Sequence, residues 1–416
     1  MTQRTTPIAQ IAYYHGDRHT GALTLVNIDT QGEAQIHAIP SAPASALPPL
    51  EKPVLLGVTP ARQGVVLDPK TKKISLCDAL PADSFPAHVY RDPYSGHDWY
   101  MNDGDKDSGN DTLNCGQQGS SVSVVADSAR PQARLLATIC VGRGHHQAAF
   151  TAPSPHAPQV PRRAFISNLK DGTLSVIGAD PNDAATYLKC ISTLNLCEPE
   201  KESLPDTTIP NNAYPHGLVY SPVTGKVYNL NNGYGTVAII DPATARIEKR
   251  IDFKGHSNLF IAAGGRYVIG RGADRKRDPH HVIAKLSVLD ATNLQIVDTL
   301  DIPDIYISKY YLNGDESKLY LTTSVSGSPE QQQHLKTDTL VVLDMHALPK
   351  LKINAELRVG PIGGLAFYPE HGMPRYVFAS HAPAGELIMI DSAHAQVIKR
   401  IPAHTPCEYS RIWLAT

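Results

Sequence analysis

The feature that most constrains this chain is a pattern of short strands that returns about every fifty residues. The clearest unit covers residues 216–253. Gly217–Ser221, Lys226–Leu230 and Thr236–Asp241 are predicted strands, and Arg246–Asp252 alternates polar with apolar residues as an outer strand does. Turn residues separate the four stretches. A four-stranded unit of this length is typical of a propeller blade.

The third strand of this unit recurs along the whole chain. Copies stand at Gly21–Asp29, Ser121–Asp127, Gly172–Gly178, Ala284–Asp290, Asp338–Asp344 and Gly385–Asp391, with a weaker copy at Lys73–Cys77. Together with residues 236–241 these copies predict an all-β chain that folds as one eight-bladed β-propeller domain over residues 1–416. A seven-bladed propeller is the alternative, because the unit at Val54–Cys77 is compressed.

The two ends of the chain resemble parts of one blade. Tyr409–Ala415 has the character of an innermost strand, and Ile8–Tyr14 that of a second strand with no first strand before it. Pairing these two segments completes a blade and leaves no open sheet edge. We therefore expect the ring to be closed by the N- and C-terminal strands.

Composition narrows the class of partner. The 416 residues carry a formal net charge of -2, and no basic patch suited to nucleic acid stands out. No apolar run is long enough to span a membrane. The N-terminus lacks an apolar signal core, which fits a periplasmic or secreted protein whose signal peptide was removed, or alternatively a cytoplasmic protein.

The six cysteines favour disulfides and an oxidising compartment. Cys115 and Cys140 bracket one predicted strand pair, and Cys190 and Cys197 are close enough in sequence to close a small loop. Buried thiols are the alternative interpretation. The absence of a CxxC motif argues against a thiolate zinc ribbon.

Histidines precede several of the predicted first strands. His88, His145, His146, His216 and His256 each follow a short turn, and the repeat predicts that they occupy equivalent places in space. His381 belongs to a loop between second and third strands, which reaches the same face of a four-stranded meander. Imidazole ligands suit zinc or copper, so these six histidines are the predicted metal ligands.

The predicted ring of histidines is lopsided. The equivalent segments of other units offer Lys309, Cys407 and Glu408, which we take as additional candidate ligands. An asymmetric set suits three or four ligands on one side of the axis. Two alternatives remain open: the histidines mark the repeat without binding metal, or the site binds an organic substrate or cofactor.

An acidic segment lies on the same predicted face. Asp103, Asp105, Asp107 and Asp111 carry carboxylates at alternating positions of residues 102–111, as in a calcium loop. The sixth position is Ser108 where such loops have glycine, and no bidentate glutamate follows. A polar insertion without calcium is one alternative, and an acidic loop that captures or releases a transition metal is another, so Asp103 and Asp105 are also candidate metal ligands.

The strand pattern resembles the bacterial YVTN-type propellers and their superfamily neighbours, which include the haem d1 propellers. This resemblance covers nearly the whole chain and implies the fold. Three segments, at His88–Tyr90, His145–Phe150 and His216–Leu218, are similar to those of periplasmic zinc metallochaperone propellers. That local resemblance implies that His88, His145 or His146, and His216 are ligands.

The sequence leaves three functions open. A metal-binding protein would hold zinc or copper and pass it to a metal-accepting periplasmic protein. An oxidoreductase would hold copper, or haem d1 through one histidine with arginines on its carboxylates. A propeller that only docks other proteins is the third. No nucleophile-elbow, phosphate-loop or dinucleotide motif is present, so whether the chain is an enzyme stays open.

Overall fold

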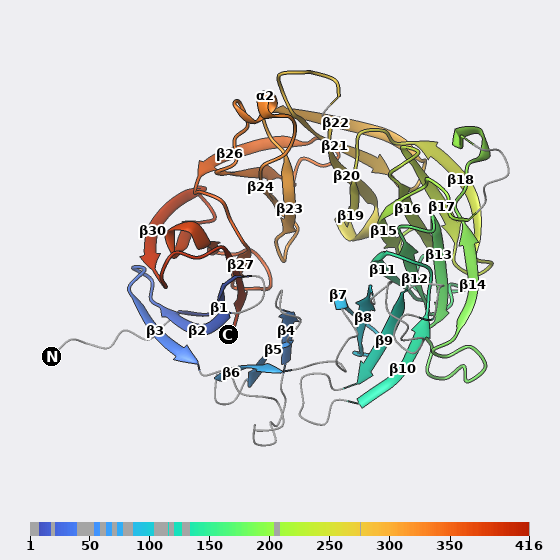
Figure 1. Cartoon of the computed structure of the whole chain (residues 1–416), viewed down its shortest axis with the longest axis horizontal. Coiled ribbons are helices and arrows are strands. Elements are labelled where there is room, and N and C mark those ends of the chain that lie inside the picture. The colour runs from blue at the N-terminus through green and yellow to red at the C-terminus, as the bar shows by residue number, and fades with distance from the viewer. Residues whose placement is uncertain are drawn as a thin grey trace.

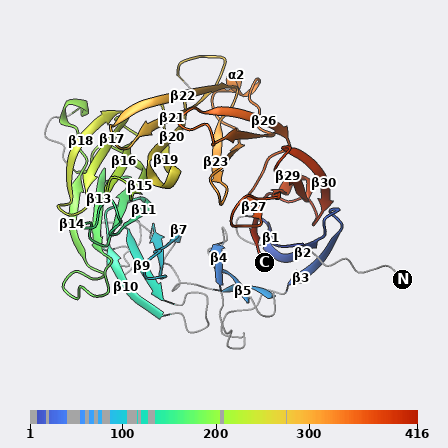
Figure 2. The same ribbon diagram turned by 180° about the vertical axis from the view of Figure 1, so that it is seen from behind.

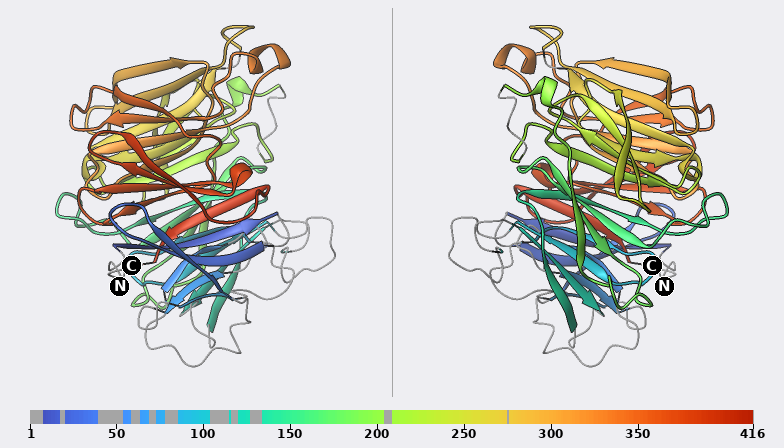
Figure 3. Two further views of the ribbon diagram at one scale, coloured as in Figure 1. Left: turned by 90° about the vertical axis from the view of Figure 1, so that its left-hand side faces the viewer. Right: turned by 90° about the vertical axis from the view of Figure 1, so that its right-hand side faces the viewer.

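The computed structural model describes residues 8–17, 21–39, 54–58, 64–68, 73–77, 86–103, 115, 120–126, 134–203, 209–274 and 276–415. These residues form seven four-stranded antiparallel sheets and one three-stranded sheet. The sheets stand side by side around a common axis (Figure 1), and the same ring is seen from behind in Figure 2. The ring is shallower along this axis than across it (Figure 3). This arrangement is consistent with a β-propeller.

The strands of the first half follow the chain from sheet to sheet. They are β1 (Ala9–Gly16), β2 (Gly21–Ile28), β3 (Ala34–Ile39), β4 (Val54–Val58), β5 (Gly64–Asp68), β6 (Lys73–Cys77), β7 (Pro86–Arg91), β8 (Asp98–Asn102), β9 (Ser121–Ala126), β10 (Arg134–Cys140), β11 (His145–Thr151), β12 (Arg163–Asn168), β13 (Thr173–Gly178) and β14 (Cys190–Asn195).

The second half continues the same order. Its strands are β15 (Pro215–Ser221), β16 (Lys226–Asn231), β17 (Thr236–Asp241), β18 (Arg246–Asp252), β19 (Asn258–Ala262), β20 (Tyr267–Asp274), β21 (Ile283–Asp290), β22 (Gln295–Pro303), β23 (Ile307–Leu312), β24 (Lys318–Thr323), β25 (Thr339–Asp344), β26 (Lys352–Arg358), β27 (Leu365–Tyr368), β28 (Tyr376–His381), β29 (Glu386–Asp391), β30 (Gln396–Pro402) and β31 (Tyr409–Leu414), with the short helix α2 (Pro329–Gln332) before β25.

The predicted strand repeat is confirmed. Every predicted third strand lies within one residue or so of an observed one, from β2 to β29. Third strands are buried along their length, as in β17, whereas outer strands such as β26 alternate between exposed and half-buried residues. The sequence pattern therefore reports which strand is covered on both faces and which lies at the rim.

The predicted pairing of the N- and C-terminal strands is also confirmed. β31 pairs antiparallel with β1, from Ile11 opposite Leu414 to Gly16 opposite Tyr409, and it forms the inner edge of the sheet with β1, β2 and β3. Ile412 is 3% exposed in a cluster that also contains Tyr13 and Phe378. The last strand is therefore hydrogen-bonded to the first sheet and packed against the sheet before it.

The core lies between neighbouring sheets. One cluster, for example, joins Phe260 and Ile269 of one sheet to Leu321 and Val341 of the next. Because each sheet buries both faces against its neighbours, its three inner strands are rich in apolar residues and only the rim is polar.

The first strands β7, β11, β15, β19, β23 and β27 lie nearest the axis in Figure 1. In the part of the chain that the structure describes, no helix is long and apolar enough to cross a membrane.

Candidate functional site

The inner strands share an irregularity at the place where the sequence repeats histidine. The register of pairing shifts at the start of β7, β11, β15 and β23, between Pro86 and His88, His145 and Ala148, Pro215 and Gly217, and Ile307 and Lys309. Such bulges change the direction in which a side chain points and are common beside binding sites. The histidine motif therefore marks a repeated bulge near the axis.

The bulges place the histidines at different register positions. Pro86, His145 and Pro215 each pair with the asparagine that ends the second strand of their sheet. Counted from this anchor, His146 and His216 stand one residue later, whereas His88 stands two residues later, at the position of Lys309. The prediction of strictly equivalent histidines is therefore corrected: a shift of one residue in a strand turns a side chain to the opposite face.

His88 lies close to other basic groups. Its side chain is solvent-exposed, yet the surrounding protein desolvates the ring and lowers its pKa, and the charges of Arg411 and His216 lower that pKa further. His88 is therefore a neutral imidazole at neutral pH, reachable from solvent.

His216 is half-buried on β15. Its Nδ1 donates a short hydrogen bond to the carbonyl of Ser257, which places the ring lone pair on Nε2. Burial lowers the His216 pKa, the hydrogen bond to Ser257 opposes that shift, and the nearby Arg271 adds to it.

His256 is not placed to bind a metal. Only 4% of the residue is exposed, and its ring stacks on Phe253 at 4.1 Å between centroids. Nδ1 lies 3.2 Å from the Phe253 carbonyl oxygen and Nε2 lies 3.0 Å from the Ser287 hydroxyl. With both nitrogens hydrogen-bonded inside the protein, His256 is a packing residue, and its predicted place among the ligands is corrected.

Three further basic residues approach the same region from three sheets. Arg271 of β20 lies over the ring of Tyr310 at 5.3 Å, and its Nη1 donates to the Ile307 carbonyl at 3.2 Å. Lys309 of β23 donates from Nζ to the Gly363 carbonyl at 2.9 Å. Arg411 comes from the closing strand β31 and acts electrostatically on both His88 and Lys309.

We call His88, His216, Arg271, Lys309 and Arg411 the basic group. Among the described residues no carboxylate forms an ion pair with Arg271 or Lys309. Burial lowers the pKa of the Arg271 guanidinium, and burial followed by the charge of Arg411 lowers the pKa of Lys309 to about 8. The Arg271 shift thus reflects burial, and the Lys309 shift reflects burial together with a neighbouring cation.

The sequence prediction missed two members of the basic group. Arg271 lies within β20, which extends to Asp274. Arg411 follows the segment at Cys407 and Glu408 to which the sequence drew attention. The signal that could have found both is a cation inside an otherwise apolar strand, which is costly unless it has a role.

His381 and Cys407 belong to another group of side chains, between β1 and the β28–β29 hairpin. His381 Nδ1 is 3.8 Å from the carboxylate of Glu386. The Cys407 thiol donates to the Tyr409 carbonyl at 3.2 Å and lies 3.7 Å from Nδ1 of His404.

Around this second group the rings are packed closely. His404 stacks on His15 at 4.2 Å between centroids, and its Nε2 is 3.0 Å from the hydroxyl of Tyr13. Glu408 is exposed beside it. Among the described residues, the polar contacts of His381 and Cys407 are thus with Glu386, His404 and Tyr409, and not with members of the basic group.

The remaining predicted ligands are placed only in part. His145 and His146 begin β11, which lies between β7 and β15, but their side chains are outside the described residues. Asp103 is exposed at the end of β8, and Asp105 with most of the predicted calcium loop lies outside the described residues. Within the described ranges no three His, Cys, Asp or Glu side chains are arranged to hold a metal ion.

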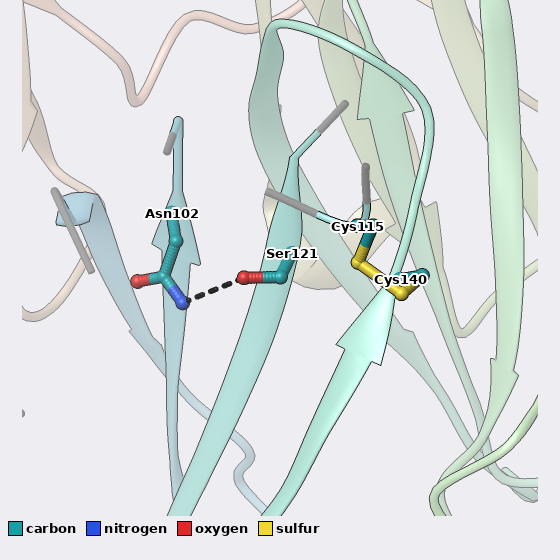
Figure 4. The surroundings of a disulfide bond; sticks show 4 residues. All are labelled: Asn102, Cys115, Ser121 and Cys140. Carbon is teal, nitrogen blue, oxygen red and sulfur yellow. Dashed lines mark hydrogen bonds between the residues drawn. A yellow bond between two sulfur atoms is a disulfide. The ribbon is translucent and has the colours of Figure 1, made fainter. Parts of the chain in front are cut away.

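One predicted disulfide is present and one is not. Cys115 and Cys140 form a disulfide beside the β8–β9 connection, where Asn102 donates to Ser121 at 3.2 Å (Figure 4). Cys190 and Cys197 remain thiols. Because β14 is extended from Cys190, at about 3.3 Å per residue, the chain carries these cysteines too far apart for the Cα separation that a disulfide needs, about 4.4–6.8 Å.

Comparison with known proteins supports the fold alone. No family model matches the sequence, and no curated protein matches it. The dihydro-heme d1 dehydrogenase NirN in complex with DHE is similar in structure, with a TM-score of 0.58, 12% identity and coverage of 99% of this chain and 76% of that one.

Two other bacterial structures are similar at the same level. The periplasmic gluconolactonase of Pseudomonas aeruginosa has a TM-score of 0.53 and 14% identity, with coverage of 86% of this chain and 98% of that one. A protein from Lactobacillus plantarum has a TM-score of 0.54 and 14% identity, with coverage of 87% and 99%. Bacterial β-propeller proteins are therefore among the structural neighbours, and the resemblance to the YVTN-type group stays a prediction.

Proposed function

We propose that this protein binds an organic ligand bearing carboxylate or phosphate groups at the basic group near the axis. The observation that carries the proposal is the buried Nε of Arg271, which finds no acceptor among the described residues. Buried polar groups in proteins are nearly always hydrogen-bonded, so an orphaned guanidinium N–H indicates a missing acceptor.

An anion satisfies the electrostatics of this region. Arg271 and Lys309 use backbone carbonyls as acceptors, which carry no net charge to balance theirs. A carboxylate or phosphate would supply that balance, and the planar guanidinium of Arg271 is suited to bind it through two parallel hydrogen bonds. His88 and His216 add neutral imidazoles that can donate or accept a hydrogen bond from the ligand.

Aromatic rings stand beside the cations and favour a ligand with a ring or apolar portion. Tyr310 stacks on Phe260 at 4.4 Å between centroids, and the Arg271 guanidinium lies over the Tyr310 ring at 5.3 Å from its centroid. Small-molecule sites typically combine such apolar surfaces with a few polar groups that fix orientation.

Haem d1 is one ligand of this chemical class. A similar structure is, by its name, a dehydrogenase of dihydro-heme d1, although at 12% identity that supports the fold alone. The donor set fits such a ligand in composition: His88 or His216 would be the histidine, and Arg271 and Arg411 would contact carboxylates. When bound, haem d1 would supply redox chemistry. The visible absorption spectrum of the purified protein tests this case.

Calorimetric titration with citrate, a tricarboxylate probe, tests anion binding directly. We expect Arg271→Met to weaken binding about 10- to 100-fold, because a hydrogen bond to a charged group contributes about 1.5–3 kcal/mol. Arg266→Met is the matched control, since Arg266 immediately precedes the same strand, lies over Tyr267 at 5.3 Å and is exposed. Equal affinity in both variants and the parent protein would contradict the proposal.

Zinc or copper binding is the second candidate. It is favoured by the hydrogen bond from His216 Nδ1 to Ser257, because a metal-binding histidine usually donates its other ring N–H to an acceptor of this kind. His88 lies within electrostatic range, and β11 brings His145 and His146 between the two strands. Such a protein would hold the ion for a metal-accepting periplasmic partner.

The neighbouring cations weigh against the metal. Arg271 and Arg411 already lower the pKa of the two histidines, and the same repulsion would oppose a divalent cation. One double variant distinguishes the two candidates. If the metal site exists, His88→Ala with His216→Ala abolishes the rise in melting temperature that zinc causes. The same variant weakens citrate binding only modestly.

We further propose that the three-stranded sheet β4–β6 counts as a blade, which makes residues 1–416 a single eight-bladed propeller domain. Its strands follow the same order as the first three strands of the other sheets, and β4 adjoins β7 as a neighbouring inner strand. The Cys115–Cys140 disulfide favours a periplasmic or secreted location. Cleavage mapping under limited proteolysis tests the single domain, since independent domains would be released as stable fragments.

A further inference from the structure

A cavity of about 480 Å³ lies beside the outer strands of the sheet β11–β14. Its walls come from β13 and β14 and from the segment that leads from the end of β10 toward β11. The lining includes Cys140, whose disulfide is drawn in Figure 4, and the apolar residues Val141, Ile209 and Pro210. A cavity of this volume is within the range of small-molecule sites.

Arg143 is held at this cavity by one carboxylate. Its Nε donates to Oδ1 of Asp171 at 2.7 Å, and its backbone N–H donates to Oδ2 of the same residue, also at 2.7 Å. Because Asp171 engages only the Nε edge of the guanidinium, Nη1 and Nη2 of Arg143 have no acceptor among the described residues. These two groups form an edge that can bind a carboxylate through two parallel hydrogen bonds.

Two buried hydroxyls of the same lining also have hydrogen atoms to donate. Thr173 and Ser175 are each 1% exposed, and each accepts a hydrogen bond from Nδ2 of Asn168 at 3.0 Å. A hydroxyl that accepts in this way keeps its own hydrogen, and within the described ranges neither O–H finds an acceptor. Buried polar groups are nearly always paired, so these donors indicate an acceptor that enters from the cavity.

The charge of the lining selects the kind of acceptor. Asp171 is the only carboxylate among the described lining residues, and both of its oxygens are already used by Arg143, so a ligand amine would find no free counter-ion. The Arg143–Asp171 pair is electrically neutral, which suits one added negative charge better than the two of a phosphate. The apolar part of the lining suits a short hydrocarbon portion.

We propose that this cavity binds a small organic monocarboxylate. Nη1 and Nη2 of Arg143 hold the carboxylate group, Asp171 fixes the guanidinium from behind, and the hydroxyls of Thr173 and Ser175 donate to the ligand oxygens. The site does not depend on the function proposed above, because no member of the basic group is among the described residues that line the cavity.

Cys190 reports on the site, because its free thiol is exposed and lines the cavity. Butyrate, as the probe, should slow the alkylation of Cys190 by iodoacetamide, whereas butyramide, which has the same size and no charge, should not. Arg143→Met should abolish the protection by butyrate. Lys189→Met is the matched control, because Lys189 precedes Cys190 in the chain but donates to the Ala185 carbonyl and is not among the described lining residues.

The alkylating reagent itself provides a second measurement. Iodoacetate and iodoacetamide both transfer a carbon to the thiolate sulfur with loss of iodide, and they differ in the carboxylate. The ratio of their rates at Cys190, read by peptide mass mapping, should fall about three- to tenfold in Arg143→Met and stay unchanged in Lys189→Met. The same ratio at Cys197, a free thiol that is not among the described lining residues, should be equal in all three proteins.

The contrary outcomes are equally specific. A ratio at Cys190 that is the same in Arg143→Met and the parent, or protection by butyramide as strong as that by butyrate, would overturn the site. Protection by inorganic phosphate as strong as that by butyrate would overturn its assignment to a monocarboxylate. The comparison of butyrate with butyramide uses the parent protein, so it decides the matter even if Arg143→Met does not fold.

Discussion

His256 gives the sharpest test of how the inner strands are packed. Its ring is buried against Phe253 with both nitrogens hydrogen-bonded, and burial lowers its pKa from the usual 6.5 to about 4. Lys285 lowers this pKa further, whereas the Phe253 carbonyl and Asp301 oppose the shift. The native state therefore holds a neutral imidazole under conditions in which the unfolded chain binds a proton.

The sign follows from linkage. Between pH 6.5 and about 4 the unfolded state binds one more proton at this position than the native state, so stability falls as the pH falls. Above pH 6.5 the contribution is fully present. A difference of about 2.5 pKa units at about 1.4 kcal/mol each corresponds to about 2.5 kcal/mol lost between pH 7.5 and pH 4.5, since the change is not complete at the lower pH.

Urea unfolding of the parent protein and of His256→Gln at several pH values measures this quantity. Replacing His256 has a constant cost from the lost stacking on Phe253, but the difference in unfolding free energy between the two proteins should shrink by about 2–3 kcal/mol from pH 7.5 to pH 4.5. Other buried histidines titrate in both proteins and cancel in the difference.

His156→Gln is the control, because His156 is exposed. Its unfolding curves should stay parallel to those of the parent at every pH. If the difference in unfolding free energy between the parent and His256→Gln were also independent of pH, His256 would not be a buried neutral imidazole. It would then no longer be excluded as a metal ligand.

Two further predictions concern the closure and the disulfide. Ile412→Ala in β31 should lower the unfolding free energy by about 2–4 kcal/mol, because this side chain is packed in the core. Ile398→Ala, at a position 42% exposed, should change it by less than about 1 kcal/mol. Similar losses in the two variants would mean that β31 is not packed in the core. Replacing both Cys115 and Cys140 by serine should lower the unfolding free energy by about 3 kcal/mol, because the disulfide closes a loop of 25 residues. Cys190→Ser, which removes a free thiol, should leave it almost unchanged. Peptide mapping without reductant should recover Cys115 joined to Cys140.

The strands could be predicted because their signals are local. A third strand buried on both faces is a short apolar run, and a rim strand alternates, so each can be read from a window of a few residues. The pairing of β1 with β31 could be predicted because the N-terminal segment has no first strand before it, and the C-terminal segment supplies such a strand. The Cys115–Cys140 pair was also within reach, since the two cysteines bracket neighbouring strands.

The histidine site was less predictable because register is not local. His88 and His216 look alike in sequence, yet the bulges put them at successive positions, and His256 falls before β19 with its ring turned into the core. A one-residue difference that the sequence motif does not record decides which face a side chain takes.

The sequence by itself determined the repeat, the strand order and the way the ends meet, because periodic burial is encoded residue by residue. Only the tertiary structure decided the chemistry near the axis. Arg271, Lys309 and Arg411 are up to 140 positions apart in the 416-residue chain, and their charges act on one region only because the ring brings three sheets together there. Electrostatic interactions depend on distance in space, which no local pattern in the sequence specifies.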